Sequence, residues 1–500
     1  MASLKKLAGQ TAWYGISSIA ARFINYLLTP YLTFKLSEAA YGEQSIVYAA
    51  IPFLNVVFTY GMETAYFRFS NKGADEKKVF STGSISLIFS TILLTGVLLL
   101  FKQPLAELLT LQNHHEFITW AVVVIALDTL TTLPFAKLRN DGRPVKYASL
   151  RVVNILINIA CVFFFYSMLP DIAKNNPGSI FAQWYDPNMG AGYYIIANII
   201  TSAITFLLLL PEFLSIKIDW DGVMWKEMLL YALPLMVAGF AGMINETFDR
   251  IMLGWWAPVA TMQEKKEQVG IYSACYKLSI LISLFIQAFR MGAEPFFFQQ
   301  SKGEDAPKTY ARVMKFFVIT ICGMFLVVAL YLDIWKEFIR NRHMWTGLAV
   351  VPILLIANMC LGVYYNMAIW YKLSHKTNAG ATITIIGAVI TLIINYFFIP
   401  QYSYMACAWA TLACYASMML VSYFWGQRVY PVPYATGRLL SYFGLMLLLY
   451  FVYRGVCLWT GDTMTHYIVA TIFLLVYVLF TIKLEGKELK GVPILNRFIK

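Results

Sequence analysis

Long apolar runs separated by short polar stretches dominate the hydrophobic pattern of this chain. Fourteen runs are long enough to cross a bilayer as α-helices, which needs about 20 predominantly apolar residues. Backbone polar groups in lipid must be satisfied inside the spanning segment, so we expect each run to be helical. The approximate limits are 10–34, 43–67, 79–101, 116–138, 146–169, 190–214, 228–254, 269–292, 310–332, 346–371, 377–399, 403–427, 437–459 and 463–483.

Composition supports an all-α polytopic membrane protein. The 500 residues are 59% hydrophobic and 13% charged, whereas a soluble domain has about a quarter charged residues. The seven cysteines fall inside apolar runs with no spacing typical of a metal site or a disulfide framework, so we expect neither metal nor cofactor. We find no phosphate-binding loop, nucleophile elbow or cluster of catalytic carboxylates, which disfavours an ATP-driven pump or a membrane hydrolase.

The distribution of basic residues predicts the orientation. If the N-terminus is cytoplasmic, 26 of the 39 basic residues lie in cytoplasmic loops and tails, and most of the others lie on the opposite face. This asymmetry obeys the positive-inside rule and places both termini in the cytoplasm. It also accounts for most of the net charge of +12, so we do not expect a nucleic-acid partner.

Two basic residues lie deep inside apolar runs, Arg22 in the first and Lys277 in the eighth. A Lys or Arg at bilayer depth costs roughly 2.5–3.5 kcal/mol, so we expect both to face an internal cavity rather than lipid. Their charge favours a phosphate-bearing or carboxylate ligand. Asn25 and Tyr26 share the helix face of Arg22 and complete this predicted cationic cavity. The alternative is structural ion pairing, for example between Arg22 and Asp128.

Three acidic residues are candidates for gating or coupling. Asp128 lies in the middle of the fourth run, where it is either a counter-ion or a site for a coupling proton or cation. Glu63 and Glu294 lie near the cytoplasmic ends of the second and eighth runs. They are expected to fix helix ends or an inner gate, with substrate contact as the alternative.

A second group of charges lies near the outer end of the seventh run. Glu246 and Arg250 are four residues apart on one expected helix, which is the geometry of a local ion pair. Asp249 lies beside Arg250 in the sequence, and the two form either a gate or a structural anchor.

The sequence carries a weak internal repeat. Gly42 and Gly270 occupy equivalent positions at the outer ends of the second and eighth runs. A Gly-x-Glu motif, ending at Glu63 and Glu294, lies near the opposite end of each run. The offset is about 230 residues or six runs, an even number, so the two halves should share one topology, as in a parallel repeat.

A second match at about the same offset joins Lys137-Leu138 to Lys372-Leu373. The repeat predicts an N-terminal lobe of six helices and a C-terminal lobe of six helices around a central cavity, with two further helices and a cytoplasmic tail. The expected division is 1–220, 221–430 and 431–500.

Three stretches resemble the polysaccharide-biosynthesis membrane proteins, which are bacterial lipid-linked oligosaccharide flippases of the multidrug/oligosaccharidyl-lipid/polysaccharide exporter superfamily. They are Asn245–Gly254 with the sequence NETFDRIMLG, Val269–Leu278 with the sequence VGIYSACYKL, and Gly61–Arg68 with the sequence GMETAYFR. The likeness runs over nearly the whole chain and includes the fourteen-span count.

The resemblance implies a V-shaped transporter of the bacterial inner membrane that works by alternating access. It would move an undecaprenyl-diphosphate-linked glycan for O-antigen, capsule or exopolysaccharide synthesis, with membrane lipids and glycan polymerase machinery as further candidate partners. Arg22 and Lys277 would receive the diphosphate, and Arg68 and Arg290 would capture it first at the cytoplasmic mouth. No covalent bond would be made or broken, so an enzyme is not expected.

Three alternatives stay open. A multidrug or cation antiporter of the same superfamily would be expected to have an acidic or apolar cavity, which the two deep cations disfavour. A membrane ligase or polymerase would be expected to carry a large external catalytic loop, whereas the longest outer loop has about twenty residues and no obvious acid–base set. A non-transporting scaffold for glycan assembly is the third alternative.

Overall fold

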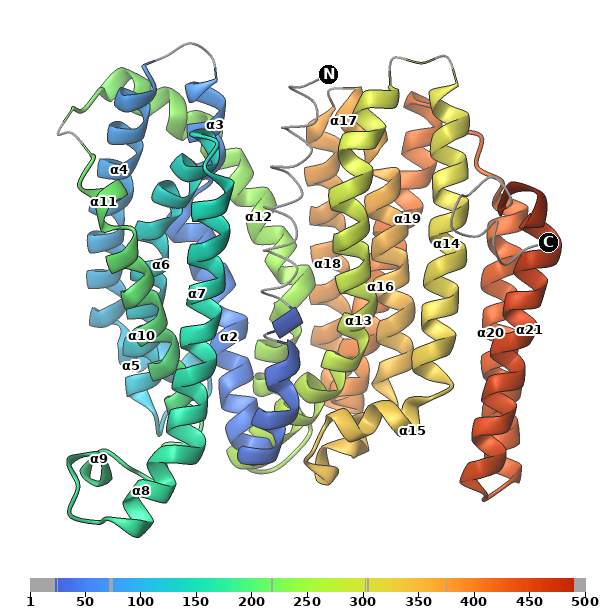
Figure 1. The fold of residues 1–500 in the computed structure, drawn as a ribbon, viewed down its shortest axis with the longest axis horizontal. Coiled ribbons are helices and arrows are strands. Elements are labelled where there is room, and N and C mark those ends of the chain that lie inside the picture. The colour runs from blue at the N-terminus through green and yellow to red at the C-terminus, as the bar shows by residue number, and fades with distance from the viewer. Residues whose placement is uncertain are drawn as a thin grey trace. The chain divides into compact units, whose positions relative to one another are not determined.

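The regular secondary structure of the described residues is helical (Figure 1). The computed structural model describes residues 23–24, 26–71, 75–216, 219–301, 303, 305–374 and 376–489, and these residues contain no β-strand. Eleven of the described helical segments are long and apolar enough to cross a membrane, and a bent helix pair raises the number to twelve. The chain is therefore a multi-pass α-helical membrane protein, as the hydrophobic pattern predicts.

Each expected segment after the first coincides with helical structure. The sixth expected segment corresponds to α10 (Gly192–Leu208), an apolar helix of 17 residues. The first segment falls largely outside the described residues. The other expected segments correspond to α2 (Glu38–Thr59), α3 (Met62–Ser70), α4 (Glu76–Leu100), α6 (His115–Asn140), α7 (Pro144–Phe163), α12 (Gly222–Trp256), α13 (Met262–Gln300), α14 (Ala306–Ala329), α16 (Val350–Met367), α17 (Ile369–Leu373), α18 (Thr377–Tyr402), α19 (Tyr404–Val429), α20 (Thr436–Trp459) and α21 (Thr463–Leu489).

The second expected segment is broken rather than continuous. Tyr60 and Gly61 have left-handed backbone conformations, with φ of 33° and 75°, and α2 and α3 meet at a bend of 40°. Gly61 suits this position because it lacks a Cβ, which would otherwise lie 3.0 Å from the Ala232 carbonyl oxygen of α12. The break sets the direction of α3 and therefore of Glu63, its second residue.

The chain folds into two compact units. The first comprises 1–274, 340–347 and 384–410. Within it α6 packs against α2, α4 and α10, while α12 packs against α2 and α3. Its core includes Tyr66, Phe80 and Met228, which are almost fully buried. Beyond α7, the short helices α8 (Leu169–Asn175) and α9 (Ile180–Gln183) form the long loop before α10 (Figure 1).

The second unit comprises 275–339, 348–383 and 411–500. Its helix α14 packs against α16, α20 and α21, and α20 and α21 run side by side (Figure 1). A buried ion pair joins Lys315 of α14 to Glu485 of α21, with Nζ and Oε2 2.5 Å apart. Tyr442 of α20 donates to the same carboxylate at 3.2 Å. This network holds the C-terminal helix pair on α14.

The helix α13 is shared between the two units. Its first part, to Ala274, belongs to the first unit, and the remainder, from Cys275, belongs to the second. This helix has 39 residues. The helices α18 and α19 are also divided between the two units, after residues 383 and 410.

Candidate functional site

Lys277 lies in the middle of α13, about 22 Å from the start of the helix at 1.5 Å per residue. Its side chain is half-buried. The opposite face of α13 is fixed by hydrogen bonds to Asn358 of α16, which accepts from Ser283 at 2.9 Å and donates to Ser279 Oγ at 3.2 Å. Because Ser279 and Ser283 point about 200–240° around the helix from Lys277, these bonds direct Lys277 away from α16.

The structure describes only part of the expected cationic cavity. Arg22 and Asn25 lie outside the described residues. Tyr26 is buried, and its ring stacks on Phe23 with ring centres 6.4 Å apart. A common cavity for Arg22 and Lys277 thus stays a prediction.

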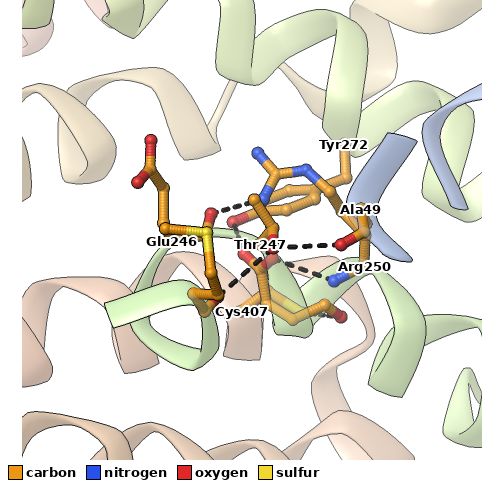
Figure 2. Close-up of polar contacts among 8 residues, drawn as sticks. Ala49, Glu246, Thr247, Arg250, Tyr272 and Cys407 are labelled. Atoms are coloured by element: carbon orange, nitrogen blue, oxygen red, sulfur yellow. Dashed lines mark hydrogen bonds and ion pairs between the residues drawn. The ribbon is translucent and has the colours of Figure 1, made fainter. Parts of the chain in front are cut away.

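The Asp249–Arg250 motif forms a compact buried network (Figure 2). The Asp249 carboxylate accepts from Arg250 Nη1 at 2.8 Å through one oxygen and from the Tyr272 hydroxyl at 2.5 Å through the other. The Arg250 guanidinium lies 5.5 Å from the centre of the Tyr272 ring. The Asp249 carboxylate is thus engaged on both oxygens, and the geometry is that of an anchor between α12 and the first part of α13.

The residues around this motif extend the anchor to other helices. The Thr247 hydroxyl donates to the Ala49 carbonyl of α2 at 3.2 Å (Figure 2). Asn245 donates to the Thr384 carbonyl of α18 at 3.0 Å. The Cys407 thiol of α19 lies 3.8 Å from the Asp249 carbonyl oxygen. This stretch of α12 is therefore tied to four other helices of the first unit, which explains why polar residues are placed inside an apolar segment.

The expected side-chain pair between Glu246 and Arg250 does not form. Arg250 Nη1 donates to the backbone carbonyl of Glu246 at 2.8 Å instead, while the exposed Glu246 carboxylate points away from the guanidinium (Figure 2). The sequence spacing correctly placed Glu246 and Arg250 on one helix face. The guanidinium nevertheless pairs with the carboxylate of the adjacent Asp249.

Asp128 is exposed although it lies in the middle of α6. One carboxylate oxygen accepts from the Ser202 hydroxyl of α10 at 2.7 Å. An exposed carboxylate at this depth is costly in lipid, so it should face water inside the protein. Its role as a site for a coupling proton or cation stays a prediction. Pairing with Arg22, the other expectation, lies outside the described residues.

The two carboxylates of the internal repeat make similar ion pairs, although the partner of Glu63 is Arg139 and not Lys137, which the repeat matches to Lys372. Glu63 of α3 pairs with Arg139 near the end of α6. Glu294 of α13 pairs with Lys372 of α17, with Nζ and Oε1 2.7 Å apart, and with Arg290 at 3.2 Å. In each unit the Gly-x-Glu motif is therefore held by a cation from the end of a helix two segments further along. This arrangement favours the fixing of helix ends over direct substrate contact.

Arg68 and Arg290, expected at the cytoplasmic mouth, are each held over an aromatic ring. The Arg68 guanidinium lies 4.0 Å from the centre of the Tyr231 ring, and that of Arg290 lies 4.3 Å from the Tyr365 ring. Cation–π contact keeps the charge while it fixes the side chain. Arg68 is exposed and Arg290 half-buried, so both keep some access to solvent.

A groove of about 510 Å³ in the second unit has a different chemistry. Its lining comes from α13, α14, α15 (Leu332–Trp335) and α21 and contains no charged side chain. An apolar groove offers no partner for an anion, so it is not a candidate for the cationic site.

The ion pair near the start of α13 was not predicted from the sequence. Lys266, near the start of α13, forms a buried ion pair with Glu43 of α2. The glycines Gly42 and Gly270 of the internal repeat lie close to this ion pair. They indicated that the two helices occupy equivalent positions in the repeat, but they did not predict that the helices touch.

Solved structures with the same fold are membrane transporters. The lipid II flippase MurJ in an inward closed conformation is 14% identical, with a TM-score of 0.68 over 95% of this chain and 99% of that one. An inward-facing multidrug resistance MATE family transporter of the MOP superfamily is 13% identical, with a TM-score of 0.59 over 84% and 94%. The Vibrio cholerae MATE transporter VcmN, solved as a point mutant, is 14% identical, with a TM-score of 0.56 over 85% and 96%.

At 13–14% identity, these likenesses show a shared fold alone. A search with the sequence among curated proteins found no match. The polysaccharide biosynthesis protein family matches residues 7–301, more than half of the chain. The protein belongs to this family, as the Asn245–Gly254 and Val269–Leu278 stretches indicated.

Proposed function

We propose that this protein is a flippase that moves an undecaprenyl-diphosphate-linked oligosaccharide across the bacterial inner membrane. The observation that carries the proposal is Lys277, a cation in the middle of the membrane-spanning helix α13, in a chain of the polysaccharide biosynthesis family. A lysine at this depth is costly unless it faces water or an anion. A lipid diphosphate supplies such an anion, while its isoprenoid tail stays in the bilayer.

The proposed transport step requires only binding and a change of access. Arg68 and Arg290 meet the diphosphate at the cytoplasmic mouth, and Arg22 and Lys277 hold it deeper in the protein. Charge-assisted bonds to phosphate oxygens are stronger than neutral hydrogen bonds. The protein then opens to the outer leaflet and releases the headgroup. In this scheme both termini are cytoplasmic, and the glycan is an O-antigen, capsule or exopolysaccharide unit.

Multidrug or cation antiport is the second candidate function. Two observations favour it, the fold shared with MATE transporters and the exposed carboxylates of Asp128 and Glu246 in the first unit. Exposed carboxylates inside a transporter suit cationic ligands. Efflux of a cationic dye from vesicles that contain the purified protein would support this function, and the absence of efflux would favour the flippase.

A deletion strain tests the proposal in the cell. We expect it to accumulate the lipid-linked oligosaccharide on the cytoplasmic leaflet and to lose the corresponding surface glycan, since synthesis continues while translocation stops. Leaflet-resolved labelling of the lipid-linked unit, before and after plasmid complementation, measures this. Normal surface glycan in a strain without a redundant transporter would contradict the proposal.

A further inference from the structure

The first parts of α2 and α13 cross at two glycines. A Cβ on Gly42 would overlap the Lys266 carbonyl oxygen, and a Cβ on Gly270 would overlap the Glu38 carbonyl oxygen. The contact is reciprocal, because each glycine meets the residue one helical turn before the other glycine. The two positions that the internal repeat made equivalent are therefore in direct contact, with backbone against backbone.

A buried ion pair closes the same crossing. The Lys266 ammonium donates to Glu43 Oε1 at 2.7 Å, and the two residues are 4% and 8% exposed. The His114 ring, stacked on Phe117, places Nε2 4.0 Å from the same carboxylate oxygen. His114 also lies 2.9 Å from Glu116. Lys266 and Glu43 are withdrawn from water together, so removal of one partner would leave a buried charge uncompensated. The side chains of His114 and Glu116 stay partly exposed.

The crossing lies on the face of α13 that carries Lys277. Lys266, Gly270, Ser273 and Lys277 are separated by four, three and four residues, so they share one side of the helix. Lys277 lies roughly 16 Å from Lys266 along the helix axis, at 1.5 Å per residue. Ser273, between the two, is buried. While the crossing is closed, this face is covered at the end where α13 begins.

We propose that the Glu43–Lys266 ion pair and the Gly42–Gly270 contact form a latch that opens and closes during transport. The latch lies at the end of α2 and α13 that the positive-inside orientation places on the outer side. It rests on the proposed function, because release of a headgroup outward requires this end of the α13 face to open.

The chemistry of the crossing suits a contact that must be both firm and reversible. Glycines let the two backbones approach without interlocking side chains, so the helices can separate without repacking. The ion pair stabilises the closed state, but each charge regains hydration when the crossing opens. This hydration stabilises the open state, so the free-energy difference between the closed and open states becomes smaller. A purely apolar crossing would have no such compensation.

Thiol labelling from outside the cell tests the latch. The seven native cysteines are replaced in the full chain, Ser273→Cys is introduced, and a membrane-impermeant maleimide is applied. We expect slow labelling with the ion pair intact and about tenfold faster labelling in Glu43→Gln, the scale of a typical coupling between sites. Glu267→Gln, which changes a half-buried carboxylate next to Lys266, is the control and should leave the rate unchanged.

Two further variants guard against misfolding. Glu43→Gln with Lys266→Met removes both charges and leaves no buried ion, and it should also label faster. The charge reversal Glu43→Lys with Lys266→Glu should restore slow labelling. Rates equal to that of the intact pair in both Glu43→Gln and the double neutral variant would overturn the proposal.

A covalent bridge across the crossing distinguishes a contact that must open during transport from one that only stabilises the fold. In the cysteine-free chain, Glu43→Cys and Lys266→Cys are bridged with a reducible bifunctional thiol reagent. We expect transport of the lipid-linked oligosaccharide to stop on bridging and to return on reduction. Undiminished transport by the bridged protein would overturn the latch. If the unmodified protein moves no such lipid, the proposed function fails, while the labelling rates still decide whether the latch opens.

Discussion

Replacement of Lys277 by alanine is expected to reduce transport of the lipid-linked oligosaccharide by about 10- to 100-fold without loss of folded protein. The reason is the loss of a charge-assisted bond to the diphosphate, which contributes about 1.5–3 kcal/mol. Folding should persist, because Lys277 is only half-buried and the opposite face of α13 keeps its hydrogen bonds to Asn358. Transport into vesicles, normalised to monodisperse protein, measures the effect.

Two comparisons sharpen this result. Lys277→Arg retains the charge and the capacity to bind phosphate, so it should keep most of the activity. Lys308→Ala removes an exposed lysine whose partner Asp305 is equally exposed, and it should have no effect. Full activity in both Lys277→Ala and Arg22→Ala would refute the assignment of a cationic site.

Replacement of Asp249 by alanine is expected to be the most damaging change to stability. It leaves the buried Arg250 guanidinium without its carboxylate and removes the acceptor of the Tyr272 hydroxyl. Breaking a buried ion pair in this way costs about 3–5 kcal/mol. The thermal unfolding midpoint of the detergent-purified protein should fall by several degrees.

Glu246→Gln provides the matched control for Asp249→Ala. It changes a carboxylate on the same helix, three residues earlier, that is exposed and points away from Arg250. Its unfolding midpoint should equal that of the unchanged protein. If Asp249→Ala unfolds at the same temperature as Glu246→Gln, the motif is not a structural anchor, and a gating role becomes the better interpretation.

The spans could be predicted from sequence because lipid imposes a simple constraint. A segment that crosses a bilayer must be apolar and helical over its full length, so hydrophobicity alone located all the described helices of spanning length. The bend between α2 and α3 was not anticipated, since a single glycine in an apolar run has many causes. The left-handed conformations of Tyr60 and Gly61 became evident only in the structure.

The partners of the charged residues were harder to predict, because they come from distant parts of the sequence. Glu43 and Lys266 are 223 residues apart, and no local pattern connects them. The local pair that we predicted, Glu246 with Arg250, does not form, because Arg250 pairs with the adjacent Asp249. Another local pair, between Arg290 and Glu294, does form. The repeat matched Glu63 to Glu294, but it did not predict that each pairs with a cation near the end of a later helix.

Reconstitution tests the central claim most directly. The purified protein is placed in vesicles with a fluorescent undecaprenyl-diphosphate-linked oligosaccharide, and an impermeant reagent that destroys outer-leaflet fluorescence reports the fraction exposed over time. A flippase should bring nearly the whole lipid-linked pool within reach of the reagent, and Lys277→Ala should slow this markedly. If the inner-leaflet fluorescence is lost no faster than in protein-free vesicles, the protein does not move this lipid.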